Sequence, residues 1–376
     1  MPNIPTPFAP VVLGGITAAN RIVMAPMTRS RAVGGTPNEA TVDYYTQRAS
    51  AGLIITEGIQ PSAIGQGYPD TPGLHDEAQI GAWRRVTDSV HAAGGRIVAQ
   101  LMHSGRIGHP TTSAAAGNGP LTPVAPSPVR PAGTIFTPEG PREYVTPREL
   151  THSEIDATIA DFASAAANAI AAGFDGVEVH AANGYLLHQF LAPNSNTRID
   201  SWGGEPQNRI RFTLEVVRAV VEAIGAERTG IRISPANGLG DTHETDAAEV
   251  YPLLVSALDG LALAYLHVVE AGAPELLPEL RELWHGVLIL NPVDLQLDAH
   301  PARLERIASG EADLISFGRL FISNPDLVAR LEAEAPLAEP DMSKAYGGDQ
   351  RGYSDYPARG SVKAADVSVV SEGSPS

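Results

Sequence analysis

The sequence contains no cysteine among its 376 residues. Disulfides, a thiolate nucleophile and cysteine-ligated zinc or iron–sulfur clusters are therefore excluded, and we expect no metal centre. Basic residues are also scarce, because 26 Lys and Arg stand against 43 Asp and Glu, for a formal net charge of −17. A field of that sign repels phosphate backbones and anionic lipids, so neither nucleic acid nor a membrane surface is an expected partner.

Long apolar segments are absent as well. An alanine-rich stretch at residues 162–174 lies between Asp161 and Asp175 and is too short to cross a bilayer. Residues 1–10 carry prolines and no basic cluster before an apolar run, unlike a secretory signal. Apolar residues nevertheless make up 43% of the chain, enough for a buried core. We therefore expect a soluble, globular, cytoplasmic protein.

Short apolar runs recur between longer amphipathic segments, as in α/β proteins with parallel sheets. The expected strands are residues 21–25, 53–56, 96–101, 176–180, 230–234, 265–270, 286–290 and 313–317. The clearest helical patterns cover residues 76–93, 153–172, 208–224, 247–258 and 324–334. This number of strand–helix units, without a linker, favours a closed (β/α)8 TIM barrel over a doubly wound sheet, which more often has about five or six strands.

A barrel of this kind needs roughly 250 residues, so the remaining residues must form extensions. Residues 105–150, after the third strand, contain nine prolines and no helical period, which predicts a capping insertion. The residues before Arg21, with Gly14 and Gly15 among apolar positions, predict a hairpin that closes the bottom of the barrel. We expect one barrel domain over residues 1–357 and a small, polar, disordered tail over residues 358–376.

Polar residues gather where barrel enzymes place their chemistry, at the carboxyl ends of the strands. His180 and Asn183 follow the fourth strand at i and i+3 and can aim two N–H donors at one carbonyl oxygen. Tyr185 approaches from another direction and, with a phenol pKa of about 10, is a proton donor at neutral pH. These residues predict addition across a conjugated double bond, which requires a hydride and therefore a redox cofactor.

Two arginines suggest where that cofactor lies. Arg319 follows Gly318 at the end of the eighth strand, where barrels commonly bind phosphate, and this suits a phosphorylated cofactor such as FMN. Arg232 ends the fifth strand, and an unpaired cation inside a barrel is costly, which favours a role in cofactor binding. The sequence has neither a GxGxxG motif after a strand nor a GxxxxGK[ST] loop, so no Rossmann or P-loop nucleotide site is indicated.

Four ordered segments carry a resemblance to a known family. They are residues 20–29 (NRIVMAPMTR), 100–106 (QLMHSGR), 180–191 (HAANGYLLHQFL) and 317–327 (FGRLFISNPDL). From about Pro7 to Tyr356 the chain resembles the old yellow enzymes, which are FMN-dependent ene-reductases. The resemblance implies a (β/α)8 barrel with tightly, non-covalently bound FMN that NADPH or NADH reduces. It also implies a small-molecule activated alkene as substrate, an α,β-unsaturated carbonyl or nitro compound whose C=C bond is reduced.

The resemblance further implies individual roles. Residues expected to bind the flavin or its phosphate are Pro26, Met27, Thr28, Gly58, Gln100, Arg232, Gly318 and Arg319. Thr28 belongs to the branch of the family that has threonine there rather than cysteine. The catalytic set is His180 and Asn183, which would hold the substrate oxygen, and Tyr185, which would protonate the alkene. Substrate contacts are also expected from Met102 and from a closing segment that contains Tyr346, Tyr353 and Tyr356.

Two departures from the family pattern stand out. Met102 occupies a position where the family usually has tryptophan, and a methionine wall is smaller and more flexible. After the seventh strand the chain reads Asn291-Pro292-Val293-Asp294 in place of asparagine-glycine-glycine, and Pro292 has no N–H to offer a phosphate.

Alternative functions are a redox-neutral FMN-dependent isomerase and a flavin-free barrel lyase or isomerase for a phosphorylated substrate. A monomer and a homo-oligomer are both compatible with the sequence.

Overall fold

Eight parallel strands close into a barrel in this computed structural model, which describes residues 6–292 and 300–359. In spatial order the strands are β3 (Ile22–Met24), β4 (Leu53–Ile59), β5 (Ile97–Leu101), β10 (Gly176–Ala181), β11 (Thr229–Ile233), β12 (Tyr265–Glu270), β13 (Leu288–Pro292) and β14 (Leu314–Phe317). The predicted (β/α)8 TIM barrel is confirmed, and every strand lies where its apolar run predicted it, with small shifts of the boundaries. The predicted tail from residue 360 onward lies outside the described residues.

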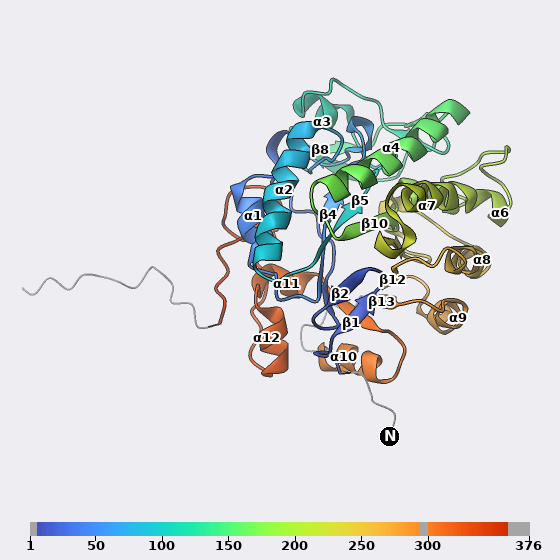
Figure 1. The fold of residues 1–376 in the computed structure, drawn as a ribbon. Helices are drawn as coiled ribbons and strands as arrows, with labels where there is room; N and C mark the ends of the chain where they lie inside the picture. Colours follow the sequence, from blue (N-terminus) through green and yellow to red (C-terminus); the bar gives the residue numbers. More distant parts are fainter. Residues whose placement is uncertain (1–5, 293–299, 360–376) are drawn as a thin grey trace, which may run out of the picture.

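Helices surround the barrel (Figure 1). The longer ones are α1 (Glu39–Thr46), α2 (Glu77–Ala92), α4 (His152–Ala171), α7 (Arg211–Ile224), α8 (Ala247–Asp259), α9 (Leu277–Leu283) and α10 (His300–Ala308). The shorter ones are α3 (Pro110–Ala115), α5 (Leu186–Leu191), α6 (Pro206–Arg209), α11 (Arg319–Ser323) and α12 (Leu327–Glu332). Local capping fixes where several begin, as at α4, where Thr151 and Glu154 form a capping box. Across the described chain, none of the helices combines the length and apolarity of a membrane span.

The lower interior of the barrel is apolar. Successive side chains of a strand point to opposite faces, so every second residue points inward. Near the amino ends these residues form one buried cluster that includes Val23, Leu53, Val98 and Leu314. The ring of Tyr265 fits inside it because its neighbour is Gly230, where a Cβ atom would lie 2.3 Å from that ring.

The predicted hairpin closes this end of the barrel, as β1 (Val11–Leu13) paired with β2 (Ile16–Ala18). Leu13, Ile16 and Ala18 belong to the same buried cluster as the inward-facing strand residues. The turn requires glycine, because Gly14 has φ +54° and a Cβ there would lie 2.4 Å from the carbonyl oxygen of Glu227. The hairpin is therefore held against the barrel by both its apolar side chains and its backbone.

The insertion at residues 105–150 lies at the other end of the barrel (Figure 1). It contains β6 (Val124–Ala125), the hairpin β7 (Thr134–Thr137) and β8 (Gly140–Glu143), and β9 (Arg148–Glu149). It also contains α3, so the expectation that this segment has no helix was wrong. The six residues of α3 are too few to show a helical period, although the helix begins with a proline at its first position, where the missing N–H has no cost.

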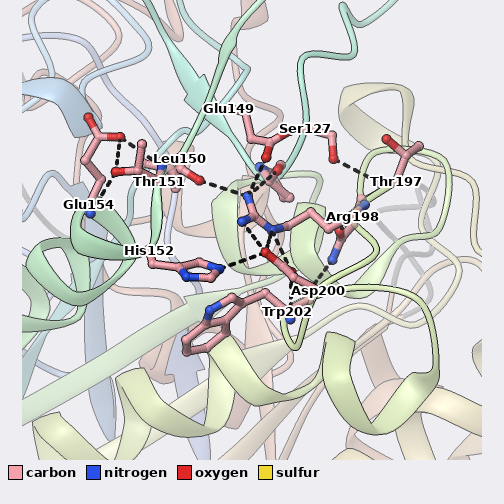
Figure 2. Close-up of polar contacts among 12 residues, drawn as sticks. Ser127, Glu149, Leu150, Thr151, His152, Glu154, Thr197, Arg198, Asp200 and Trp202 are labelled. Atoms are coloured by element: carbon pink, nitrogen blue, oxygen red, sulfur yellow. Dashed lines mark hydrogen bonds and ion pairs between the residues drawn. The ribbon is translucent and has the colours of Figure 1, made fainter.

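Arg198 fastens this insertion to the barrel (Figure 2). Its Nη1 donates to the carbonyl oxygens of Pro126 and Leu150, at 3.0 and 2.8 Å, and its Nη2 pairs with Asp200 at 2.6 Å. The backbone N–H of Thr197 donates to Ser127 Oγ at 3.0 Å. Because two separate parts of the insertion meet one buried guanidinium, the cap is fixed relative to the loop that follows α5.

Candidate active site

The carboxyl ends of the strands surround a cavity of about 290 Å³. Of the residues predicted for the site, it is lined by Pro26, Met27, Thr28, Gly58, Gln100, Met102, His180, Asn183, Tyr185, Arg232, Gly318, Arg319 and Tyr346. A second cavity of about 560 Å³ shares Thr28, Tyr185 and Tyr346 with the first and extends to Tyr68 and Phe136. The first cavity reaches down into the barrel, and the second has a mainly aromatic wall.

His180, at the end of β10, is a neutral hydrogen-bond donor. Its Nδ1 accepts the backbone N–H of Ala182 at 3.2 Å, so the ring proton is on Nε2. Burial, and then the charge of Arg232, lower the pKa of His180 well below its usual 6.5. The imidazole therefore lines the cavity without a charge and with a single N–H to donate.

Asn183 lies on the loop after β10 in the left-handed region, with φ +56°. Asparagine is among the few residues that adopt this conformation readily. Its backbone N–H donates to Ser234 Oγ at 2.8 Å, which joins this loop to the end of β11. The turn brings the Asn183 side chain to the same cavity as His180.

Tyr185 is a protonated phenol in this cavity. Its hydroxyl donates to Tyr68 Oη at 3.2 Å, and its ring meets that of His180 edge to face, with centroids 5.0 Å apart. Burial raises the pKa of Tyr185 above its ordinary 10, although the hydrogen bond with Tyr68 opposes the shift. The hydroxyl therefore keeps its proton at neutral pH and can give it to a strong base formed beside it.

Below the cavity a chain of buried polar groups crosses the barrel. Gln100 Nε2 donates to Glu178 Oε1 at 2.8 Å, and Glu178 Oε2 lies 2.8 Å from His267 Nδ1. His267 Nε2 lies in turn 2.9 Å from Ser316 Oγ. Because a carboxylate only accepts, the NH2 group of Gln100 must face Glu178, and its amide oxygen is left as an acceptor.

Glu178 is ionised in this network. Burial alone would raise the pKa of Glu178, but His267, Arg232 and the hydrogen bond from Gln100 together bring it below the usual value. The carboxylate is fully buried and has a hydrogen-bond partner at each oxygen, as a buried charge requires.

Arg232 supplies a buried cation at the wall of the cavity. It is 5% exposed, and its Nη2 donates to Asn291 Oδ1 at 2.6 Å. Its Nε is buried and has no hydrogen-bond partner among the described residues. A buried guanidinium with an unused donor fits a ligand that presents an acceptor or a negative charge.

Arg29 places Tyr346 at the mouth of the cavity. Its guanidinium donates to the carbonyl oxygens of Ala345 and Gly352, and its own carbonyl oxygen accepts the N–H of Gly347 at 2.9 Å. Because Thr28 precedes Arg29 in sequence, the residue expected to touch the flavin and the residue that fixes the closing segment are neighbours.

Comparison with known proteins gives a consistent result. The sequence profile of the NADH:flavin oxidoreductase / NADH oxidase family matches residues 7–338. The chain is 40% identical over 382 residues to 12-oxophytodienoate reductase 7 of Oryza sativa subsp. japonica, covering 95% of each. It is 39% identical over 368 residues to a probable flavin mononucleotide-dependent alkene reductase of Leishmania infantum, covering 94% of this chain and 98% of that one.

Among solved structures, the old yellow enzyme homologue from Zymomonas mobilis is 40% identical, with a TM-score of 0.88 over 94% of this chain and 99% of that one. The chain belongs to the old yellow enzyme family. It is an FMN-dependent oxidoreductase that takes its electrons from NAD(P)H, and the resemblance drawn from the four sequence segments is confirmed.

The old yellow enzyme fold brings together every predicted site residue except Tyr356. That side chain lines neither cavity, and its hydroxyl accepts the backbone N–H of Asp341 at 2.9 Å. Tyr353 is fully buried and stacks on Tyr44, with ring centroids 4.2 Å apart, so it belongs to the core rather than to a cover over the site. Of the departing loop, Asn291 and Pro292 end β13, whereas Val293 and Asp294 lie outside the described residues.

Several residues at this site were not anticipated from the sequence. Tyr68 contacts Tyr185, Phe136 comes from the capping insertion, and Glu178 was interpreted as the partner of an arginine rather than of Gln100 and His267. A usable signal existed only for Glu178, because its place on a strand between two others makes neighbours on both sides polar candidates.

Proposed function

We propose that this enzyme reduces the C=C bond of α,β-unsaturated carbonyl or nitro compounds, with His180 and Asn183 holding the substrate oxygen and Tyr185 supplying the proton. The observation that carries this proposal is the convergence of these side chains on one cavity: a neutral imidazole donor, a carboxamide and a protonated phenol. The curated relatives named as alkene and 12-oxophytodienoate reductases support the same reaction class.

The residues of the cavity fit FMN. The amide oxygen of Gln100 is an acceptor for the imide N–H of a flavin, and the unused donor of Arg232 suits the carbonyl beside it. Thr28 offers a hydroxyl, and Arg319 is an exposed cation at the start of α11 for the phosphate. Bound FMN supplies the redox chemistry, because it takes a hydride from NAD(P)H and passes it to the β carbon of the alkene.

The protein contributes position and protons. His180 and Asn183 donate hydrogen bonds to the substrate oxygen and stabilise the negative charge that forms on it as the β carbon gains the hydride. Tyr185 then gives its hydroxyl proton to the α carbon, and a proton from solvent restores the phenol. The alkene thus gains one hydride and one proton, and NAD(P)H becomes NAD(P)+.

The alternatives carry less support. A flavin-free lyase does not fit a chain that belongs to an FMN-dependent family over residues 7–338. A redox-neutral isomerase would not require a separate proton donor that keeps its proton at neutral pH, which Tyr185 does.

The proposal is tested with Tyr185→Phe and anaerobic stopped-flow measurement of the two half-reactions. Flavin reduction by NADH or NADPH should keep its wild-type rate, because the phenol gives no proton in that step. Reoxidation by an enone should slow by roughly 10²-fold, the contribution typical of a general acid. Equal slowing of both half-reactions would contradict the proton-donor role, and failure of any enone to reoxidise the wild-type flavin would contradict the proposed reaction.

A further inference from the structure

Asn183 can hold a substrate oxygen only if its NH2 group, and not its amide oxygen, faces the cavity. The two ends of a carboxamide have the same shape and opposite hydrogen-bonding character. A residue outside the cavity must therefore decide which end faces inward. Asn237, on the loop after β11, is in contact with Asn183: its Nδ2 lies 3.0 Å from Asn183 Oδ1.

The orientation of Asn237 follows from the backbone. Its Oδ1 lies 3.1 Å from the backbone N of Leu239, and an N–H can only donate, so the atom that faces Leu239 must be the amide oxygen. The other end of Asn237, which faces Asn183, is then the NH2 group. Two NH2 groups cannot hydrogen-bond to each other, so Asn183 must present its oxygen to Asn237 and its NH2 group to the cavity.

The loop that carries Asn237 is closely fitted to the loop that carries Asn183. A Cβ atom on Gly184 would lie 2.2 Å from the carbonyl oxygen of Leu239, so the two backbones are in direct contact there. Thr242 Oγ1 donates to the carbonyl oxygens of both Asn237 and Leu239 at 2.8 Å. Asn237 itself is 8% exposed and lines neither cavity, so it acts on the site through Asn183 alone.

We propose that Asn237 is a positioning residue that fixes the side-chain amide of Asn183 with its NH2 group toward the substrate oxygen. The proposal rests on the proposed function, because it concerns the group that holds that oxygen. Its hydrogen bonds run from the backbone N–H of Leu239 to Asn237 and from Asn237 to Asn183, so the direction of the last donor is set by a group that cannot turn around.

Asn237→Asp gives the sharpest test, because a carboxylate only accepts. One oxygen of the introduced carboxylate would still accept the N–H of Leu239, but its second oxygen would attract the NH2 group of Asn183 and turn the Asn183 oxygen into the cavity. The probe is pentafluorophenolate, used at a pH where it is ionised, whose oxyanion needs the same donors. Its Kd is measured on the FMN-loaded enzyme from the change in flavin absorbance.

We expect Asn183→Ala to weaken phenolate binding by about tenfold, and Asn237→Asp to weaken it by on the order of 10²-fold, because an oxygen then replaces the donor. Asn237→Ala should cost only a few-fold, since the freed amide can still adopt the productive orientation. In the Asn183→Ala background, Asn237→Asp should change the Kd by no more than about twofold, since the two residues act in series.

The double variant separates positioning from other effects. If Asn237→Asp still weakens binding in the Asn183→Ala background, the cause is charge repulsion or a damaged loop, and the inference is wrong. It is also wrong if Asn237→Asp leaves the Kd at the wild-type value. Should the aspartate variant fail to fold, the smaller effect of Asn237→Ala must likewise disappear in the Asn183→Ala background. If Asn183→Ala itself does not weaken binding, the proposed grip on the substrate oxygen fails, and the inference with it.

Discussion

The interior of the barrel is divided into an apolar lower half and a polar upper half, although both are built from the same strands. Gln100 follows Val98 by two positions along β5, and His267 follows Tyr265 by two positions along β12. The lower layer packs against the hairpin of β1 and β2, whereas the upper layer carries buried Glu178 and Arg232. One period-two pattern thus serves stability at one end and chemistry at the other.

The comparison also shows what the polar half costs. Burying Glu178, His267 and Arg232 removes them from water, which is unfavourable unless their hydrogen bonds are replaced. Most are replaced within the protein, by Gln100, Ser316 and Asn291. The Nε of Arg232 is not, among the described residues, and it lies at the cavity wall. The polar layer is therefore completed by a ligand rather than by the fold.

The largest expected effect is on stability and comes from the lower half. Leu53 is fully buried in the apolar layer, so Leu53→Ala should lower the free energy of unfolding by about 2–5 kcal/mol. The flavin spectrum and the turnover of the folded fraction should stay at wild-type values. Urea unfolding followed by circular dichroism measures the loss, with Val12→Ala, at a position 60% exposed, as the near-neutral control. A change in turnover per bound flavin would show that the two halves are not separable.

In the upper half the expected effect is on rate. His180→Ala removes one of the two donors to the substrate oxygen and should raise the barrier of the alkene step by about 3 kcal/mol. Stability should change far less than with Leu53→Ala, because the Nε2 donor of His180 faces the cavity rather than another side chain. Single-turnover reoxidation by an enone measures the first effect and urea unfolding the second. Unaltered enone reduction would remove His180 from the mechanism.

Much of this division could be predicted from the sequence. Apolar runs located the strands of the barrel, and the segments at their carboxyl ends named the residues that now line the cavity. Those predictions succeeded because period-two alternation and the placement of chemistry in a barrel are local or fold-level properties. Tyr356 was the exception among the site residues. Its place in a terminal segment is decided by what the chain packs against, which no local pattern records.

The supporting contacts were out of reach for the same reason. Asn237 and Asn183 are 54 residues apart, and Tyr68 and Tyr185 are 117 residues apart, on loops without periodicity. Glu178 was visible as a buried carboxylate candidate, but its partners depend on strand register. The pairing of Glu178 with Gln100 across β10 and β5 is a property of the closed sheet. Sequence therefore indicates which side chains reach the site, and tertiary structure decides what orients them.

A smaller effect is expected from the charge of the polar layer. Glu178→Gln keeps the shape and removes one buried negative charge, so reduced flavin, which is more negatively charged, should be favoured. We expect the flavin midpoint potential to rise by about 20–40 mV, or ~1–2 kcal/mol for a two-electron couple. Glu244→Gln is a matched control, because Glu244 is another buried carboxylate paired with a histidine, His188, at 2.8 Å but lines neither cavity. An equal shift in both variants would deny Glu178 a specific role.

The smallest expected effect is the absence of a titration. Burial and the charge of Arg232 lower the pKa of His180 well below 6.5, so the imidazole stays neutral between about pH 6 and pH 8. The unfolded chain binds that proton more readily, so the folded state gains stability from this group as pH rises through the unfolded pKa of about 6.5. Nitrogen-15 NMR of the His180 ring should report a neutral form protonated at Nε2 throughout that range. An imidazolium signal there would mean that His180 meets the substrate oxygen as a cation, and the upper half would then hold its charge at the substrate side of the cavity as well as at Arg232.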